Sequence, residues 1–88
     1  MDINSIRVEL RSFILGSFLF TDDESELTDS QSLLETSVVD STGILELVMF
    51  LEESYAIKVD DAEMLPENLD SVDAICSFAA EKISRKSA

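Results

Sequence analysis

The chain has 88 residues, a formal net charge of −13 and a hydrophobic fraction of 45%. This length fits one small domain with a modest core, and the acidic balance makes nucleic acid and anionic membrane surfaces poor partners. Because there is no histidine and only one cysteine, histidine-based catalysis, histidine metal sites and an internal disulfide are excluded.

Targeting signals are absent from the sequence pattern. No run approaches the roughly 18 apolar residues of a membrane-spanning helix. The acidic Asp2 near the start is unlike the basic beginning of a secretory signal. We therefore expect a cytoplasmic protein. Because the chain starts at Met1 and lacks long linkers, we expect residues 1–88 to form a single free-standing domain. We also expect a monomer.

The first predicted element is an amphipathic helix from about Asn4 to Gly16. Its apolar residues recur at helical spacing: Ile3, Ile6, Leu10, Phe13 and Ile14. Phe18 and Phe20 follow, and we expect them to lie in a short extended piece that anchors the next segment on the core. Residues 21–39 are polar and predict a long loop pinned to the core by Leu27, Leu33 and Leu34.

The second predicted helix is the centre of the sequence. A core-facing stripe is formed by residues at helical spacing: Ile44, Leu47, Val48, Leu51 and Tyr55. Asp40 and Ser41 precede this stripe, and both residue types cap helices well because a short side-chain oxygen can accept from amides of the first turn. Considered alone, Ser41 is most simply interpreted as such a cap.

The remainder predicts a short helical turn and a last helix. Asp60 can cap a turn that ends before Pro66, and residues 66–68 predict a turn or linker. Ser71 caps the last helix, whose stripe is Val72, Ile75, Cys76, Ala79 and Ile83. Cys76 is expected to be a buried apolar residue. Lys82, Arg85 and Lys86 suit the negative end of this helix.

These elements predict an all-α fold. It is a small bundle of three principal helices plus one short helix, with a long loop between the first two. The charge along it is uneven, because residues 12–57 contain no Lys or Arg but ten acids. An acidic region without counter-charge in sequence favours docking to basic partners.

Asp40-Ser41, followed by a helix that ends Leu51-Glu52-Glu53, resembles the attachment motif of the acyl carrier protein family. The similarity covers nearly all 88 residues. In that family the serine of an Asp-Ser-Leu motif is esterified with 4′-phosphopantetheine, so the resemblance implies this cofactor on Ser41. It also implies that Asp40 assists loading by helping to hold magnesium for the phosphopantetheinyl transferase. Catalytic residues and a resident metal site are not expected.

A second pair, Asp70-Ser71-Val72, matches the third position of that motif better than Asp40-Ser41-Thr42 does. Only Ser41 begins the second helix, so Ser71 is interpreted as a cap. Thr42 stands where the family usually has leucine, and Gly43 where an acid is common. We expect Gly43 to leave room for the prosthetic arm or an enzyme. These departures leave the cargo open, and an amino acid or specialised acyl group is preferred over routine fatty-acid elongation.

A docking surface is predicted on the outer side of the second helix and on the following short turn. It combines exposed apolar residues with surrounding acids: Leu45, Glu46, Met49, Glu52, Glu53, Asp60, Asp61 and Glu63. The resemblance implies the same region, with acyl- or aminoacyl-loading ligases and downstream synthases or transferases as partners.

The preferred function is therefore a non-catalytic carrier that holds an acyl or aminoacyl thioester on a Ser41-linked arm. An unmodified acidic adaptor or inhibitor, which docks to a basic protein surface, is the alternative. A metal-buffering protein has no ligand constellation to support it.

Overall fold

The computed structural model describes the backbone of residues 2–87 and the side chains of residues 2–85. Lys86, expected near the end of the last helix, lies outside the described side chains. The described chain forms four α-helices: α1 (Ile3–Ile14), α2 (Ser41–Tyr55), the short α3 (Pro66–Leu69) and α4 (Val72–Ser87). This confirms the small all-α bundle. Among residues 2–87, no helix has both the length and the apolar content that crossing a membrane requires.

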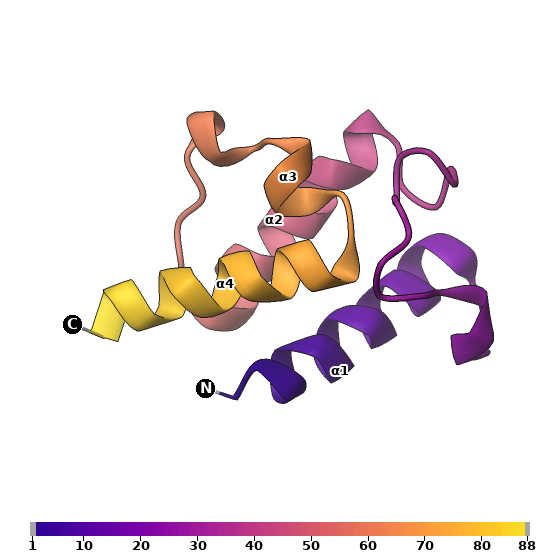
Figure 1. Cartoon of the computed structure of the whole chain (residues 1–88), viewed down its shortest axis with the longest axis horizontal. Helices are drawn as coiled ribbons and strands as arrows, with labels where there is room; N and C mark the ends of the chain where they lie inside the picture. The colour runs from indigo at the N-terminus through magenta and orange to yellow at the C-terminus, as the bar shows by residue number, and fades with distance from the viewer. Residues whose placement is uncertain (1, 88) are drawn as a thin grey trace.

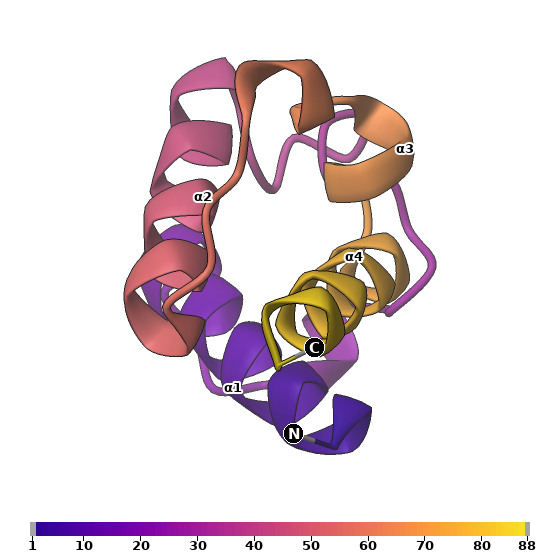
Figure 2. The ribbon, with the colours of Figure 1, turned by 90° about the vertical axis from the view of Figure 1, so that its left-hand side faces the viewer.

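The helices surround one core. Figure 1 shows α1 and α4 along one side of the molecule, and Figure 2 shows α2 facing α3 and α4 with α1 at the base. The expected stripes supply this core, because Ile6, Leu10 and Ile14 of α1, Leu47 and Leu51 of α2, and Val72, Ile75, Cys76 and Ala79 of α4 are each fully buried. Cys76 is thus the buried apolar residue that was expected, and this burial raises the pKa of its thiol.

The end of α1 differs from the expected helix followed by an extended piece. A π-helical turn, η1 (Leu15–Leu19), continues directly from α1, and Phe20 then takes a left-handed conformation with φ of 54°. Phe18 packs edge-on against Phe13, with ring centroids 5.8 Å apart. Phe20 instead is 83% exposed. The prediction that Phe20 anchors the loop was therefore wrong, because the π turn directs it away from the core.

The long loop is pinned by two of its three leucines. Leu27 and Leu33 are buried, whereas Leu34 is 39% exposed, so the prediction for Leu34 was wrong. A short 3₁₀ turn, η2 (Glu24–Glu26), interrupts the loop. Leu33 and Leu34 are neighbours on a turn, so when one side chain enters the core the other is turned toward solvent.

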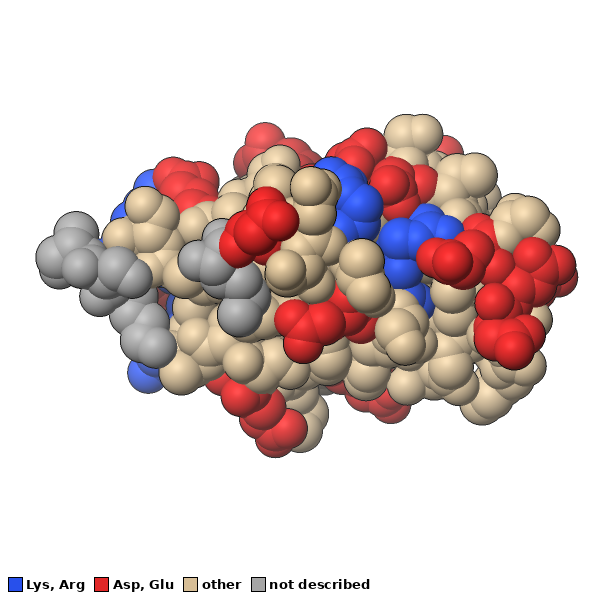
Figure 3. All heavy atoms as spheres, turned by 90° about the horizontal axis from the view of Figure 1, so that it is seen from below, with Lys and Arg blue, Asp and Glu red and all other residues tan. Residues whose placement is uncertain are grey.

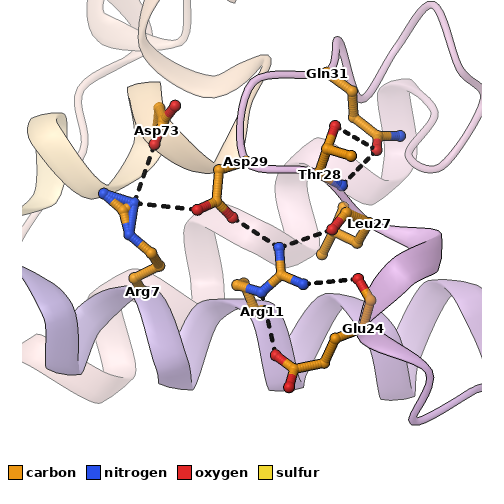
Figure 4. Close-up of polar contacts among 8 residues, drawn as sticks. All are labelled: Arg7, Arg11, Glu24, Leu27, Thr28, Asp29, Gln31 and Asp73. Atoms are coloured by element: carbon orange, nitrogen blue, oxygen red, sulfur yellow. Dashed lines mark hydrogen bonds and ion pairs between the residues drawn. The ribbon is translucent and has the colours of Figure 1, made fainter.

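Arginines of α1 fasten the first half of this loop (Figure 4). Arg11 donates to the carbonyls of Glu24 and Leu27, each at 2.9 Å, and to Asp29 Oδ1 at 2.7 Å. Arg7 pairs with Asp29 at 3.5 Å and with Asp73 of α4 at 3.0 Å. Asp29 therefore acquires two counter-charges in the fold although none lies near it in sequence, so this loop acid is less available to partners than the sequence indicates.

The segment after α2 also differs in detail. The expected turn is present as a 3₁₀ turn, η3 (Asp61–Glu63), and the Glu63 carboxylate accepts from the Asp60 amide at 3.1 Å. Residues 66–68, expected as a turn or linker, belong instead to α3. Pro66 stands at its first position, where the missing N–H costs nothing and the fixed φ suits a helix.

Candidate functional site

The start of α2 presents Ser41 to solvent. Asp40 is the cap: its Oδ1 accepts from the Gly43 amide at 2.7 Å, and its carbonyl accepts from the Ile44 amide at 3.0 Å. Ser41 is the first residue of the helix and is exposed, and its hydroxyl makes no hydrogen bond to the described residues. The capping role that could explain Ser41 is therefore performed by Asp40, which leaves the Ser41 hydroxyl available.

The first turn of α2 also carries favourable electrostatics for an anion. The unpaired amides of a helix start and the positive end of the macrodipole attract negative charge. Asp40 occupies the Gly43 amide, so the earlier amides of the turn stay available. A phosphate on Ser41 would gain about 0.3–1 kcal/mol from such an exposed position.

Gly43, in the first turn of α2, is buried against the end of the long loop and against η1. A Cβ at this position would lie 2.8 Å from Val39 Cγ1, 2.9 Å from Phe18 Cε1 and 3.3 Å from Asp40 Oδ1. The expectation that Gly43 leaves room for an arm or an enzyme was therefore wrong. The absence of a side chain instead lets η1 and the end of the loop approach the first turn of α2, which fixes the backbone that carries Ser41.

The second Asp-Ser pair has a different local role. The Ser71 hydroxyl accepts from the Ala74 amide at 3.1 Å, as expected of a helix cap, and Ser71 is half-buried. The Asp70 carboxylate points to the long loop and does not cap α4. It accepts from the Ser32 hydroxyl and the Leu34 amide. The spacing of apolar residues along a helix does not predict that Asp70 contacts the loop, so sequence reasoning missed this residue.

The outer side of α2 matches the predicted surface in part. Leu45 and Met49 are 53% and 56% exposed, and Glu46 and Glu53 are also exposed. These two glutamates and Met49 line a shallow hollow of about 290 Å³ together with Phe13, Phe50 and Ser54. Sequence reasoning did not assign Phe50 to this hollow. The ring stacks on Phe13 at 4.3 Å, so the floor of the hollow is aromatic.

Two of the predicted surface acids are engaged within the chain. Glu52 is half-buried and accepts from the Val59 amide at 2.9 Å. Glu63 pairs with Lys82 at 2.8 Å, and this contact, together with the Asp60 amide, lowers the pKa of Glu63. Asp60 and Asp61 are exposed. Figure 3 shows one face of the molecule, where acids are widespread and border the basic groups near its middle.

A small apolar hollow lies between the loop, α2 and α3. It has a volume of about 70 Å³ and includes Leu34, Ile44, Leu65 and Leu69 in its lining. Ile44 is three residues after Ser41, so the hollow borders the first turn of α2. Its volume is roughly half that of a 150 Å³ cavity that holds a benzene ring.

Comparison with known proteins places this arrangement in a family. The chain is 34% identical to an acyl carrier protein of Thermotoga maritima over 61 residues, which are 69% of this chain and 73% of that protein. This chain belongs to the acyl carrier protein family. It is also 34% identical to an acyl carrier protein of Rubrobacter xylanophilus over 59 residues, which are 67% of this chain and 70% of that one. No family model matches the chain.

Membership of the acyl carrier protein family means that the chain has a carrier role in general. Its helical bundle agrees with that family.

Proposed function

We propose that this protein carries an acyl or aminoacyl group on 4′-phosphopantetheine attached to Ser41, in the cytoplasm and without catalysis of its own. The observation that supports this most strongly is the exposed Ser41 hydroxyl at the start of α2, whose capping role is taken by Asp40. When bound, the prosthetic group supplies a terminal thiol that holds the cargo as a thioester.

Attachment requires a phosphopantetheinyl transferase and coenzyme A. The Ser41 oxygen forms a bond to the phosphorus next to pantetheine, and the pyrophosphate bond of coenzyme A breaks. Adenosine 3′,5′-bisphosphate leaves, and the hydroxyl proton passes to a base on the transferase or to water. In this step the chain contributes the nucleophilic hydroxyl and the amides of the first turn of α2.

Intact mass after coexpression with a transferase tests the attachment. Wild-type protein gains the mass of one phosphopantetheine group, and Ser41→Ala gains none. Ser71→Ala, the matched control at the other Asp-Ser pair, is loaded like wild type. Loading of Ser41→Ala would refute the assignment, and an unmodified wild type would favour the acidic adaptor instead.

Asp40 has two roles in this proposal. It caps α2 through the Gly43 amide at 2.7 Å, and its negative charge assists the transferase as the family resemblance implies. Asp40→Ala removes both and costs about 1 kcal/mol of stability through the lost cap. Asp40→Asn separates them, because asparagine caps about as well as aspartate. If Asp40→Asn is stable but is loaded slowly, the role of the charge is supported. If Asp40→Asn is loaded at the wild-type rate, the charge has no role in loading.

Loading ligases and downstream enzymes are proposed to dock on the outer side of α2. Leu45 and Met49 provide apolar contact, and Glu46, Glu53, Asp60 and Asp61 provide exposed charge. Glu52 and Glu63 contribute less, because both are engaged within the chain. Met49→Ala should speed dissociation of a partner without changing its salt dependence, because truncation removes only apolar contact.

The proposed cargo is an amino acid or a specialised short acyl group. The apolar hollow beside the first turn of α2 has a volume of about 70 Å³, so a long chain enters only if α3 and the loop separate. Assays of the holo-protein with adenylating enzymes and with a fatty-acid elongation system discriminate the cargoes. Efficient support of bulk elongation would contradict this preference.

A further inference from the structure

Asp70 holds three consecutive residues of the long loop. The Ser32 hydroxyl donates to Asp70 Oδ2 at 2.6 Å, and the Leu34 amide donates to Oδ1 at 2.9 Å. Between them, the Leu33 amide donates to the Asp70 carbonyl at 2.7 Å. The contacts join residues 36 to 38 positions apart in sequence. One residue, which ends α3 just before α4, therefore holds the loop at a single place.

This place is connected directly to the segment that carries Ser41. The Val39 amide donates to the Leu33 carbonyl at 3.1 Å, which closes a turn over residues 33–39. Leu33 and Val39 are both buried, so the base of the turn is packed as well as hydrogen-bonded. Asp40 and Ser41 follow at once. Leu33 and Val39 therefore connect Asp70 to the segment that carries Ser41.

The orientation of Asp70 is not needed to cap α4. Ser71 performs that function by accepting from the Ala74 amide. Asp73 is a suitable comparison: it is an acid three residues later, in the first turn of α4, and its carboxylate pairs with Arg7. Among the described residues, the Asp73 carboxylate makes no hydrogen bond to the turn over residues 33–39. The loop contact therefore distinguishes Asp70 from its acidic neighbour.

We propose that Asp70 is a positioning residue for the loading of Ser41. Its carboxylate holds the turn over residues 33–39 in one arrangement, so that Asp40 and Ser41 meet the transferase already ordered. This rests on the proposed attachment at Ser41. If the turn loosens, only a fraction of the molecules is competent to bind, and the apparent dissociation constant rises in inverse proportion to that fraction. The chemical step within the bound complex is unchanged.

Steady-state loading by a phosphopantetheinyl transferase tests the proposal on the full-length apo-protein. Asp70→Ala should raise KM for the carrier about tenfold at unchanged kcat, which corresponds to about 1.4 kcal/mol. Asp70→Asn should fall between Asp70→Ala and wild type, because its remaining oxygen can still accept from Leu34. Asp73→Ala, the matched control, should keep the wild-type KM.

Hydrogen exchange provides a readout that does not involve the transferase. The amides of Leu34 and Val39 should exchange faster in Asp70→Ala than in wild type or Asp73→Ala. If Asp70→Ala does not fold, Ser32→Ala serves instead. It removes the Ser32 contact with Asp70, together with the contact of the Glu35 amide with the same hydroxyl, and leaves the Leu34 contact in place. It should therefore shift KM in the same direction by less. An unchanged KM in a folded Asp70→Ala, a loss in kcat alone, or unchanged exchange would overturn the proposal. Failure of wild-type protein to load would overturn the attachment at Ser41 itself.

Discussion

Replacing Gly43 with alanine tests whether the close packing at the start of α2 fixes the site. The new Cβ would lie 2.8 Å from Val39 Cγ1 and 2.9 Å from Phe18 Cε1. Carbon atoms in favourable contact are about 3.5–4.0 Å apart, so both neighbours must retreat by roughly 0.6 Å or more. Val39 is buried and Phe18 packs against Phe13, so neither can move freely.

Two opposing terms set the size of the effect. Overpacking of a core position costs about 1–3 kcal/mol. Alanine offsets up to about 1 kcal/mol of this, because it forms helices better than glycine. We therefore expect Gly43→Ala to destabilise the fold by about 1–2 kcal/mol. For a domain of this size, that lowers Tm by very roughly 4–16 °C.

Thermal and urea unfolding followed by circular dichroism measure this change. Gly16→Ala is the matched control, since a Cβ at Gly16 meets nothing within 4 Å. It should be neutral or stabilise the fold by up to about 1 kcal/mol. In a double-mutant cycle, Phe18→Leu should restore part of the free energy of unfolding that Gly43→Ala removes. If Gly43→Ala is as stable as Gly16→Ala, the reasoning is refuted. The first turn of α2 would then accommodate a Cβ at position 43 without strain.

Three further changes test other parts of the structure. The single tyrosine, Tyr55, has its pKa raised from 10.0 to about 12 by burial and by its hydrogen bond to Glu9, so phenolate absorbance should titrate near pH 12 in native protein and near 10 in denaturant. Because the neutral form is favoured in the folded state, stability should fall between these pH values, and Tyr55→Phe should remove that fall; identical titrations in both states would contradict this. Arg11→Ala should lower the free energy of unfolding by about 2–3 kcal/mol through several lost charge-assisted hydrogen bonds, and Arg11→Lys should restore less than half in urea unfolding because it lacks the planar fork. Full restoration would show that charge alone suffices. Glu46→Lys should slow association with the loading enzyme and flatten its salt dependence in stopped-flow kinetics, whereas Glu26→Lys in the loop, with the same change in net charge, should do so less; equal effects would indicate that only net charge matters.

The helices and their buried faces could be predicted because periodicity reports which side of a helix enters a core. The stripe on α2 identified Leu47, Val48 and Leu51 as buried, and the same pattern left Leu45 and Met49 exposed. Ser71 could likewise be recognised as a cap from its position before an apolar stripe, since capping depends on local geometry. These features are determined within one element, so a single sequence contains the information.

The remaining features depend on contacts between distant segments. The π turn at Leu15–Leu19 changes the direction of the chain after α1, and no apolar spacing predicts that Phe18 turns inward while Phe20 is exposed. The burial of Gly43 depends on Phe18, which lies far from it in sequence. The loop contact of Asp70 joins residues 38 positions apart. Sequence could therefore identify Ser41 as a candidate, but not the packing and hydrogen bonds that fix its surroundings.

Fragment mass spectrometry of the loaded wild-type protein tests the carrier assignment most directly. Trypsin cleaves after Arg11, Lys58 and Lys82, and residues 12–57 contain no Lys or Arg. Ser41 and Ser71 therefore fall on two different peptides, residues 12–58 and residues 59–82. After coexpression with a phosphopantetheinyl transferase, we expect the added mass of one phosphopantetheine group on the 12–58 peptide, with fragment ions that place it on Ser41. The same mass on the 59–82 peptide, or on neither peptide, would contradict the assignment.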